Sequence, residues 1–223
     1  MPARIFVLAG VNGAGKSSVG GAALEAAGAR FYNPDLHARE LMLANPALSQ
    51  DEANGQAWEL GRQGLERALA AGSQFMFETT LGARTLAAML MAGAKAGAEV
   101  HIWFAGLATP ELHIQRVKSR VALGGHDIPE PKIRRRYVSS LQNLVGLMPH
   151  LASLVVFDNS AEGDPRQGLF PRPRLVLRMK GREITEMIAP ADVPGWAKPV
   201  VMQALRLMKA AGKQHAGKPH AVK

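Results

Sequence analysis

The chain has 223 residues, enough for one sizeable α/β domain, and 47% of them are apolar, a globular proportion. It contains no cysteine, which excludes disulfide-stabilised folds and thiolate metal sites and fits a reducing compartment. No apolar run approaches the roughly 18 residues that span a bilayer, and no signal peptide precedes the first predicted strand. We therefore expect a cytoplasmic protein without membrane association.

The net charge of +9 is unevenly distributed along the chain. Residues 1–115 carry 8 Lys/Arg and 10 Asp/Glu, a net charge of −2, whereas residues 116–223 carry 19 and 8, a net charge of +11. Such asymmetry fits either nucleic-acid binding or a site for a polyanionic small molecule next to a basic tail.

A glycine-rich motif follows the first predicted strand, residues 4–9, and precedes a predicted helix over 18–27. Residues 10–17 match G-x-x-x-x-G-K-[ST], the phosphate-binding P-loop. Its glycines let successive backbone N–H groups point at phosphate oxygens, the lysine reaches the β- and γ-phosphates, and the Ser17 hydroxyl is a ligand for Mg²⁺. The predicted ATP-binding residues are Gly10, Asn12, Gly13, Ala14, Gly15, Lys16, Ser17 and Ser18.

Two further strands are predicted to end in acidic or hydroxylated residues. A strand over 29–32 is followed by Asn-Pro-Asp, which places Asp35 at the start of a helix over 36–44. A strand over 74–77 is followed by Glu78 and Thr80. Ligands bind at this carboxyl edge of open parallel sheets, so Asp35 is a candidate general base, with helix capping as the alternative role for each carboxylate.

Ser49 and Glu52 form a capping-box pattern at the start of a long helix ending near residue 71. A helix over 83–96 and a strand over 99–107 follow, and then a helix over 110–122, a glycine-containing loop and another helix from 132. Seven Lys/Arg against two Asp/Glu lie within 116–136. Basic residues on two helices joined by such a loop are typical of a lid that closes over phosphates, and a solvated charged face is the alternative.

A fifth strand is predicted over 154–157, followed by a hairpin and a terminal helix within 174–211. Residues 212–223 are basic and lack periodicity, which predicts a disordered tail. We expect residues 1–211 to form one α/β domain, with a lid at about 120–136. Its fold class is the three-layer sandwich of P-loop NTPases, with a mostly parallel central sheet.

Together these motifs resemble the zeta-toxin-like family of P-loop kinases, including chromosomal members labelled predicted ABC-type ATPases. An ABC signature, Leu-Ser-Gly-Gly-Gln, is absent from the sequence. The resemblance covers roughly residues 4–160 and is carried by residues 9–17, 33–35, 77–81, 120–129, 134–137, 140–144 and 157–160. The stretch Gly-Gly-His-Asp-Ile-Pro at 124–129 is much more specific than the P-loop itself.

The resemblance implies ATP-dependent phosphorylation of a small molecule, which in the founding toxins is the 3′-hydroxyl of UDP-N-acetylglucosamine, and an antitoxin protein as a partner. Asp35 matches the family's base, and Glu78, with Thr80 beside it, matches a carboxylate near the substrate. Arg120 and Arg134 match a pair that grips phosphates from the lid, although Arg135 or Arg136 could hold the second place.

A rival hypothesis is a nucleotide-dependent switch whose basic second half binds nucleic acid. A base beside the γ-phosphate, such as Asp35, is needed for transfer to a hydroxyl but not for gripping nucleic acid. Surfaces that bind single strands interleave aromatic and basic residues, and only Tyr137 adjoins the basic cluster. We therefore favour the kinase and consider nucleic acid an unlikely partner.

Overall fold

The computed structural model describes residues 1–21, 31–161 and 172–216. Within these ranges the chain forms a six-stranded sheet in the order β2-β1-β3-β4-β5-β6. The first four of these strands pair in parallel, and β5 and β6 extend the sheet antiparallel at one edge. This arrangement confirms the predicted α/β class with a mostly parallel sheet.

The strands and helices follow the predicted apolar runs and caps, with boundaries that differ by a few residues. The strands are β1 (Arg4–Ala9), β2 (Gln74–Thr79), β3 (Glu99–Gly106), β4 (Ser153–Asp158), β5 (Arg174–Lys180) and β6 (Glu183–Met187). The longer helices are α2 (Pro34–Ala44), α3 (Gln50–Ala71), α4 (Arg84–Lys95), α5 (Pro110–Ala122), α6 (Glu130–Leu147) and α7 (Lys198–Ala216). The short helical segments are η1 (Ser17–Gly21), η2 (Met148–His150), η4 (Pro190–Asp192) and η5 (Gly195–Ala197).

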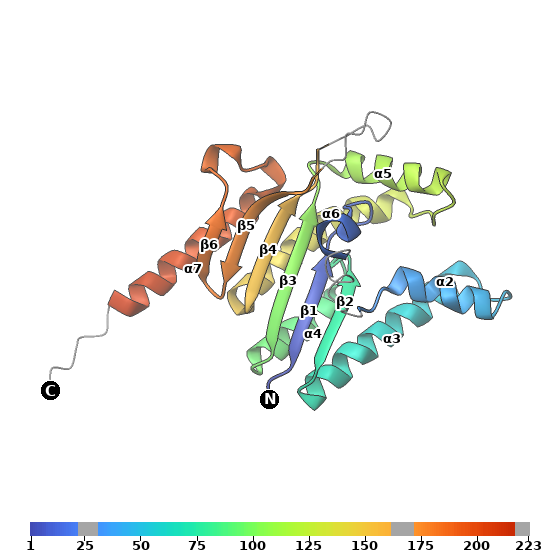
Figure 1. The fold of residues 1–223 in the computed structure, drawn as a ribbon, viewed down its shortest axis with the longest axis horizontal. Helices are drawn as coiled ribbons and strands as arrows, with labels where there is room; N and C mark the ends of the chain where they lie inside the picture. The colour runs from blue at the N-terminus through green and yellow to red at the C-terminus, as the bar shows by residue number, and fades with distance from the viewer. Residues whose placement is uncertain (22–30, 162–171, 217–223) are drawn as a thin grey trace.

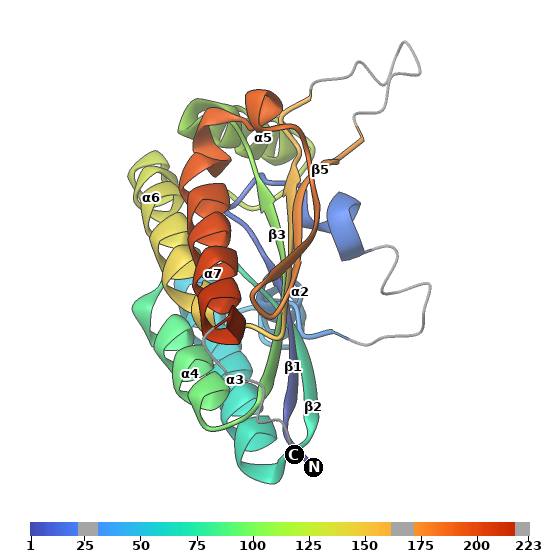
Figure 2. The ribbon, with the colours of Figure 1, turned by 90° about the vertical axis from the view of Figure 1, so that its left-hand side faces the viewer.

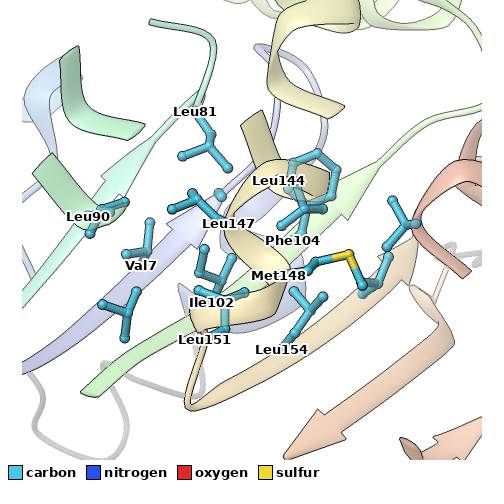
Figure 3. Packing of buried hydrophobic residues seen from close by; sticks show 14 of the residues in the cluster. Val7, Leu81, Leu90, Ile102, Phe104, Leu144, Leu147, Met148, Leu151 and Leu154 are labelled. Atoms are coloured by element: carbon cyan, nitrogen blue, oxygen red, sulfur yellow. The ribbon is translucent and has the colours of Figure 1, made fainter. Parts of the chain in front are cut away.

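One face of the sheet is covered by α3, α4, α6 and α7 (Figure 2). Alternate residues of the strands, such as Val7 and Ile102, point into this layer and are fully buried. They pack against Leu144 and Leu147 of α6, as Figure 3 shows. This apolar layer forms the main core and fixes the position of α6 over the sheet.

The other face of the sheet carries half-buried aromatic residues. The Phe6 ring stacks on His101 at 4.8 Å and on Trp103 at 6.0 Å between ring centroids. In the described part of the chain η1 lies on this side (Figure 2). Most of the helix predicted over 18–27, which would complete a third layer, falls on residues 22–30, outside the described residues.

The carboxyl ends of the parallel strands meet at one edge of the sheet (Figure 1). Ala9 at the end of β1 pairs with Thr79 of β2 on one side and Phe104 of β3 on the other. This register brings the segments that follow β1 and β2 side by side. The phosphate loop (residues 10–17) and residues 78–80 are therefore neighbours, although more than sixty positions separate them in sequence.

Helices α2 and α3 form an arm that projects beside this edge (Figure 1). The two helices pack through Ala38, Ala53 and Ala57, all fully buried, and such small side chains let helix axes approach closely. The predicted capping box is present: the Glu52 backbone N–H donates to Ser49 Oγ, and the Ser49 backbone N–H donates to Glu52 Oε2 at 2.9 Å.

One prediction is only partly covered by the structure, and another requires correction. Of the strand predicted over 29–32, the described residues 31–32 form one parallel bridge, between Tyr32 and Phe77, and residues 29–30 lie outside the described residues. Helix α7 extends to Ala216, beyond residue 212, at which a tail was expected to begin; residues 217–223 lie outside the described residues. None of the described helices is long and apolar enough to cross a bilayer.

Replacing the α3 cap tests how much the capping box stabilises the arm. We expect Ser49→Ala to lower the free energy of unfolding by about 1 kcal/mol, because the first-turn N–H groups lose their acceptor. Urea denaturation measures the change, and Ser49→Thr, which keeps the hydroxyl, serves as the control. Equal midpoints for Ser49→Ala and the original chain would contradict the assigned role.

Candidate functional site: a phosphate loop beside a polar cavity

The phosphate loop owes its shape to glycines in conformations that other residues rarely adopt. Gly10, Gly13 and Gly15 have φ angles of 150°, 81° and 74°. A Cβ atom at Gly10 would lie 2.5 Å from the carbonyl oxygen of Ala105, and one at Gly13 would lie 2.7 Å from that of His113. A side chain at either position would therefore displace the loop from β3 or α5.

Backbone N–H groups of this loop are available for a ligand. Among the hydrogen bonds within the described ranges, none is donated by the N–H groups of Asn12, Gly13 or Gly15. Successive amides in such a loop form a concave site for anions, and the tight glycines leave room for phosphate oxygens. The chemistry of the loop thus fits a nucleotide phosphate.

Two buried side chains hold the loop from behind. His113 Nδ1 lies 2.8 Å from the carbonyl oxygen of Asn12, and Asn159 Nδ2 donates to the carbonyl oxygen of Ala14 at 2.9 Å. Because a carbonyl only accepts hydrogen bonds, His113 must carry its proton on Nδ1. Sequence reasoning missed both roles, although the position of His113 on the apolar face of α5, beside Ile114, was a signal.

Burial keeps His113 neutral near pH 7. The side chain is almost inaccessible, and this desolvation lowers its pKa to about 4, with the nearby cations Lys16 and Arg116 acting in the same direction. The hydrogen bond to Asn12 opposes the shift but does not outweigh it.

Lys16 links the phosphate loop to the end of β2. Its Nζ donates to the carbonyl oxygen of Gly10 at 2.9 Å and lies 3.3 Å from Glu78 Oε1. The Lys16 and Glu78 side chains are only 10% and 13% exposed, so this ion pair is largely shielded from water. The second Glu78 oxygen, Oε2, accepts from Asn33 Nδ2 at 3.1 Å.

Asn33 connects this network to Asp35. Its Oδ1 accepts from the backbone N–H groups of Asp35, at 2.9 Å, and of Leu36, at 3.3 Å, which caps α2. The cap fixes Asp35 in the first turn of α2, where its carboxylate is exposed and lines a cavity. The capping role predicted as the alternative for Asp35 thus belongs to Asn33.

The turn after β2 is held by α6. Ser140 donates to the carbonyl oxygen of Thr80, and Asn143 Nδ2 donates to that of Leu81 at 2.7 Å. Leu81 has a φ of 55°, a left-handed conformation that is uncommon for a residue with a side chain, and these bonds stabilise it. The turn keeps Thr80 on the cavity wall beside Glu78.

A cavity of about 690 Å³ lies between the phosphate loop, the α2–α3 arm and the segment 126–136. It contains side chains from all four regions that the sequence singled out. Its wall includes Asn12 and Lys16 from the loop, Glu78 and Thr80 at the end of β2, Asp35 and Trp58 from the arm, and Lys132, Arg135 and Arg136 from α6. A volume of this size suits a small organic ligand.

The basic residues of the expected lid differ in where they point. Arg120 donates to the carbonyl oxygen of His126 at 2.8 Å, and Arg134 pairs with Glu111 at 2.5 Å; neither is among the residues that line the cavity. Arg136 does line it.

Arg136 is the lid arginine in contact with the phosphate loop. Its Nη1 donates to Asn12 Oδ1 at 2.7 Å, and the guanidinium is half-buried. Burial lowers the pKa of Arg136 below its usual value, although the neighbouring Asp35 carboxylate opposes this. Sequence spacing left Arg134, Arg135 and Arg136 open as candidates, and in this structure Arg136 is next to the loop.

Metal ligands are sparse near the loop. In the part of the chain that the structure describes, no group of three or more His, Asp or Glu residues is placed to hold a metal ion. Ser17 is exposed at the start of η1, and the side chain of Ser18 lies outside the described residues. A cation at this position would therefore depend on the Ser17 hydroxyl and on oxygens from a ligand and water.

The pH dependence of folding tests the neutral state of His113. Between about pH 6.5 and pH 4 the unfolded chain binds a proton at this residue and the folded chain does not. The free energy of unfolding should therefore fall as the pH drops through this window, by on the order of 3 kcal/mol from His113 alone. His113→Gln keeps a donor for Asn12 but cannot titrate, so its denaturation midpoints should vary less with pH. If the denaturation midpoints of the two proteins changed equally with pH, His113 would not be a buried, neutral residue in the folded chain.

Comparison with known proteins gives this geometry a family. Residues 2–160 match the family model described as Zeta toxin. An uncharacterized protein of Haemophilus influenzae is 26% identical over 137 residues, which is 61% of this chain and 94% of that protein.

Several solved structures share the fold. The AvrRxo1-ORF1:AvrRxo1-ORF2 complex with sulphate ions has a TM-score of 0.61 at 18% identity, over 82% of this chain and 60% of that chain. The same complex with ATP has a TM-score of 0.58 at 16% identity, over 91% of this chain and 64% of that chain. The structure of the PezAT chromosomal toxin-antitoxin system of Streptococcus pneumoniae has a TM-score of 0.53 at 15% identity, over 98% of this chain and 88% of that chain.

The protein thus spans less than two thirds of the matched chains in the first two structures. At these identities the structural likeness establishes the fold, and the family match extends over well more than half of the sequence. The chain therefore belongs to the zeta toxin family.

Proposed function

We propose that the protein is an ATP- and Mg²⁺-dependent kinase that transfers the γ-phosphate to a hydroxyl group of a small molecule, with UDP-N-acetylglucosamine as the first acceptor to test. The observation that carries the proposal is the shared cavity. Lys16 of the phosphate loop lines it together with two carboxylates, Asp35 and Glu78. Anion-binding groups and an exposed base beside the same space are what phosphoryl transfer to a hydroxyl needs.

The residues divide the chemistry between them. The loop amides and Lys16 bind the phosphates, which requires the Lys16 ammonium to exchange the Gly10 carbonyl for phosphate oxygens. Asp35 accepts the proton of the acceptor hydroxyl as its oxygen bonds to the γ-phosphorus and the bond to the β-phosphate oxygen breaks. Glu78 and Thr80, on the adjoining wall, are placed to hydrogen-bond the acceptor.

Ser17 is the residue that we propose for Mg²⁺. Magnesium is commonly held by one or two protein oxygens together with phosphate oxygens and water, so a single exposed hydroxyl fits this role. When bound, the ion would supply positive charge to neutralise the phosphates.

We propose that Arg120, Arg134 and Arg136 are the lid arginines that contact the phosphates. Arg136 already lies against the loop through Asn12, whereas Arg134 would have to leave Glu111 to reach a phosphate. A cation beside the γ-phosphate stabilises the charge that develops during transfer.

The contacts of the basic cluster favour the kinase over the nucleic-acid switch. Lys118 pairs with Glu130, Arg134 pairs with Glu111, and Arg136 turns inward to the phosphate loop. These pairings with Glu130 and Glu111, and the inward position of Arg136, reduce the positive charge that the cluster presents to a nucleic acid.

We also propose a protein partner and a cellular compartment. The PezAT structure is of a toxin-antitoxin system, and this likeness supports an antitoxin protein as a partner of this chain as well. The use of ATP and the absence of cysteine from the sequence favour the cytoplasm as the compartment.

Mass spectrometry tests the reaction directly. The protein is incubated with Mg-ATP and UDP-N-acetylglucosamine, and in parallel with other nucleotides, sugars and hydroxylated antibiotics. A gain of about 80 daltons on one acceptor, as phosphorylation requires, supports the proposal. ATP hydrolysis without phosphorylation of any acceptor in the panel would count against it.

Asp35→Asn separates transfer from nucleotide binding. We expect this variant to bind ATP with unchanged affinity and to lose about 10²–10⁴-fold in transfer rate, because a positioned base is removed. Calorimetry measures the affinity for ATP, and a transfer assay measures the rate. Lys16→Ala, which should abolish ATP turnover, is the control in which the phosphate site itself is disrupted. A normal transfer rate in Asp35→Asn would leave this carboxylate without a catalytic role.

A pair of lid variants identifies the arginine that reaches the phosphates. We expect Arg136→Ala to lower kcat by about 10²-fold, because it removes a cation beside the loop, and Arg134→Ala to lower it much less. Melting temperatures show whether both variants remain folded. The opposite order would mean that closing the lid breaks the Arg134–Glu111 pair and brings Arg134 into the site.

A further inference from the structure

The C-terminal segment 174–216 lies outside the family match, which ends at residue 160. The segment is nevertheless built into the domain (Figure 1): β5 and β6 extend the sheet, and α7 packs on the core through buried residues such as Val200 and Ala204. Its one aromatic residue, Trp196, lies in η5 just before α7 and is 6% exposed. The family resemblance assigns no role to this residue.

Trp196 packs against the end of β3, next to the phosphate loop. The centroids of the Trp196 and Phe104 rings are 6.2 Å apart. A Cβ atom at Gly106 would lie 2.3 Å from Trp196 Cη2, so only a glycine lets the indole lie this close to the strand. Trp196 also lines a cavity of about 10 Å³ together with Val11 of the loop and His113, one of the two side chains that hold the loop from behind.

The indole N–H of Trp196 is bonded to the turn at the end of β4. It donates to Asp158 Oδ1 at 3.1 Å, and the same oxygen accepts from the backbone N–H of Ser160 at 3.3 Å and from the Ser160 hydroxyl. Ser160 Oγ in turn accepts from the backbone N–H of Ala108 at 2.8 Å. The turn 158–160 is therefore tied to η5 on one side and to the segment after β3 on the other.

The middle residue of this turn, Asn159, is the second side chain that holds the phosphate loop. Its backbone N–H donates to the carbonyl oxygen of Gly106 at 3.0 Å, and its Nδ2 donates to that of Ala14 at 2.9 Å. Trp196 contacts the residues on both sides of this arrangement, through its bond to Asp158 and its packing on Gly106. The position of Asn159 against the loop thus depends on an indole from the far end of the chain.

We propose that Trp196 is a positioning residue of the nucleotide site, through which the C-terminal segment sets the affinity of the phosphate loop for a nucleoside triphosphate. The indole places the turn 158–160, and Asn159 then holds the loop in the shape in which its amides face the phosphates. Trp196 is not among the residues that line the large cavity, so it acts on binding rather than on transfer. This inference rests on the nucleotide binding in the proposed function.

Trp196→Phe tests the contact because it removes the indole N–H and keeps an aromatic ring over Gly106. The affinity for a non-hydrolysable ATP analogue with Mg²⁺, measured by calorimetry, should fall about tenfold, which is about 1.4 kcal/mol and the size of one hydrogen bond. With an acceptor that is phosphorylated, the KM for ATP should rise by a similar factor and kcat should stay unchanged, as expected when only binding is weakened.

Trp103→Phe is the matched control. Trp103 precedes Phe104 on β3 and therefore points to the opposite face of the sheet, where it stacks on Phe6. The same atoms are lost from a packed ring, so both variants should have lower melting temperatures. Only Trp196→Phe should bind the analogue more weakly. An equal loss of affinity in the two variants would mean that Trp196 acts on overall stability alone, and it would overturn the proposal.

A double-mutant cycle tests whether the indole acts through Asp158. Asp158→Ala should weaken the analogue at least as much as Trp196→Phe, because the indole and Ser160 both lose their acceptor. The double variant should then bind no more weakly than Asp158→Ala alone, as expected for two residues of one contact. Additive losses would show that the indole N–H does not act through this carboxylate, contrary to the proposal.

These measurements separate the role of Trp196 from the reaction. A Trp196→Phe variant that binds the analogue as tightly as the original chain would overturn this role and leave the kinase function standing. A loss of affinity in Trp196→Phe and Asp158→Ala, without any phosphorylated product in the acceptor panel, would support the role and count against the kinase. No binding of the analogue by the original chain would overturn both.

Discussion

The phosphate loop keeps its shape because two buried side chains bond its carbonyl groups from behind. His113 comes from α5 and Asn159 follows β4, so elements far apart in the sequence meet at the same loop. With the carbonyls of Asn12 and Ala14 satisfied in this way, the loop amides can face the cavity side. Both supporting side chains are largely inaccessible to water, which makes the arrangement rigid and leaves the histidine neutral.

A second network links the nucleotide side of the site to the acceptor side. Lys16 contacts Glu78, Glu78 accepts from Asn33, and Asn33 caps the helix that carries Asp35. Lys16 thus contacts both the phosphate loop and the carboxylate that bonds to the cap of α2. The loop and the proposed base are connected through three side chains.

Much of this site follows from local sequence patterns. The P-loop motif, the capping box at Ser49 and the apolar strands are signals carried by short stretches, and each is present in the structure. The polar residues after β1 and β2 could be placed together because parallel strands end at one edge of a sheet. What local patterns predict well is thus the loop, the sheet and the carboxylates beside it.

Other features depend on contacts between distant segments. Three consecutive arginines look alike in sequence, and only the positions of Glu111 and Asn12 determine that Arg134 turns outward and Arg136 inward. Of the strand expected over 29–32, only residues 31–32 are described, and there Tyr32 forms a single bridge with Phe77, a contact between segments 45 positions apart.

We expect a triphosphate in the loop and the Asp35 carboxylate to face each other across one cavity. A crystal structure with Mg²⁺ and a non-hydrolysable ATP analogue would show this arrangement. Lys16 Nζ should leave the Gly10 carbonyl for phosphate oxygens, and the γ-phosphate should lie in the cavity lined by Asp35. A triphosphate bound elsewhere, with the Lys16–Glu78 pair intact and Asp35 turned away from it, would disprove the proposed arrangement.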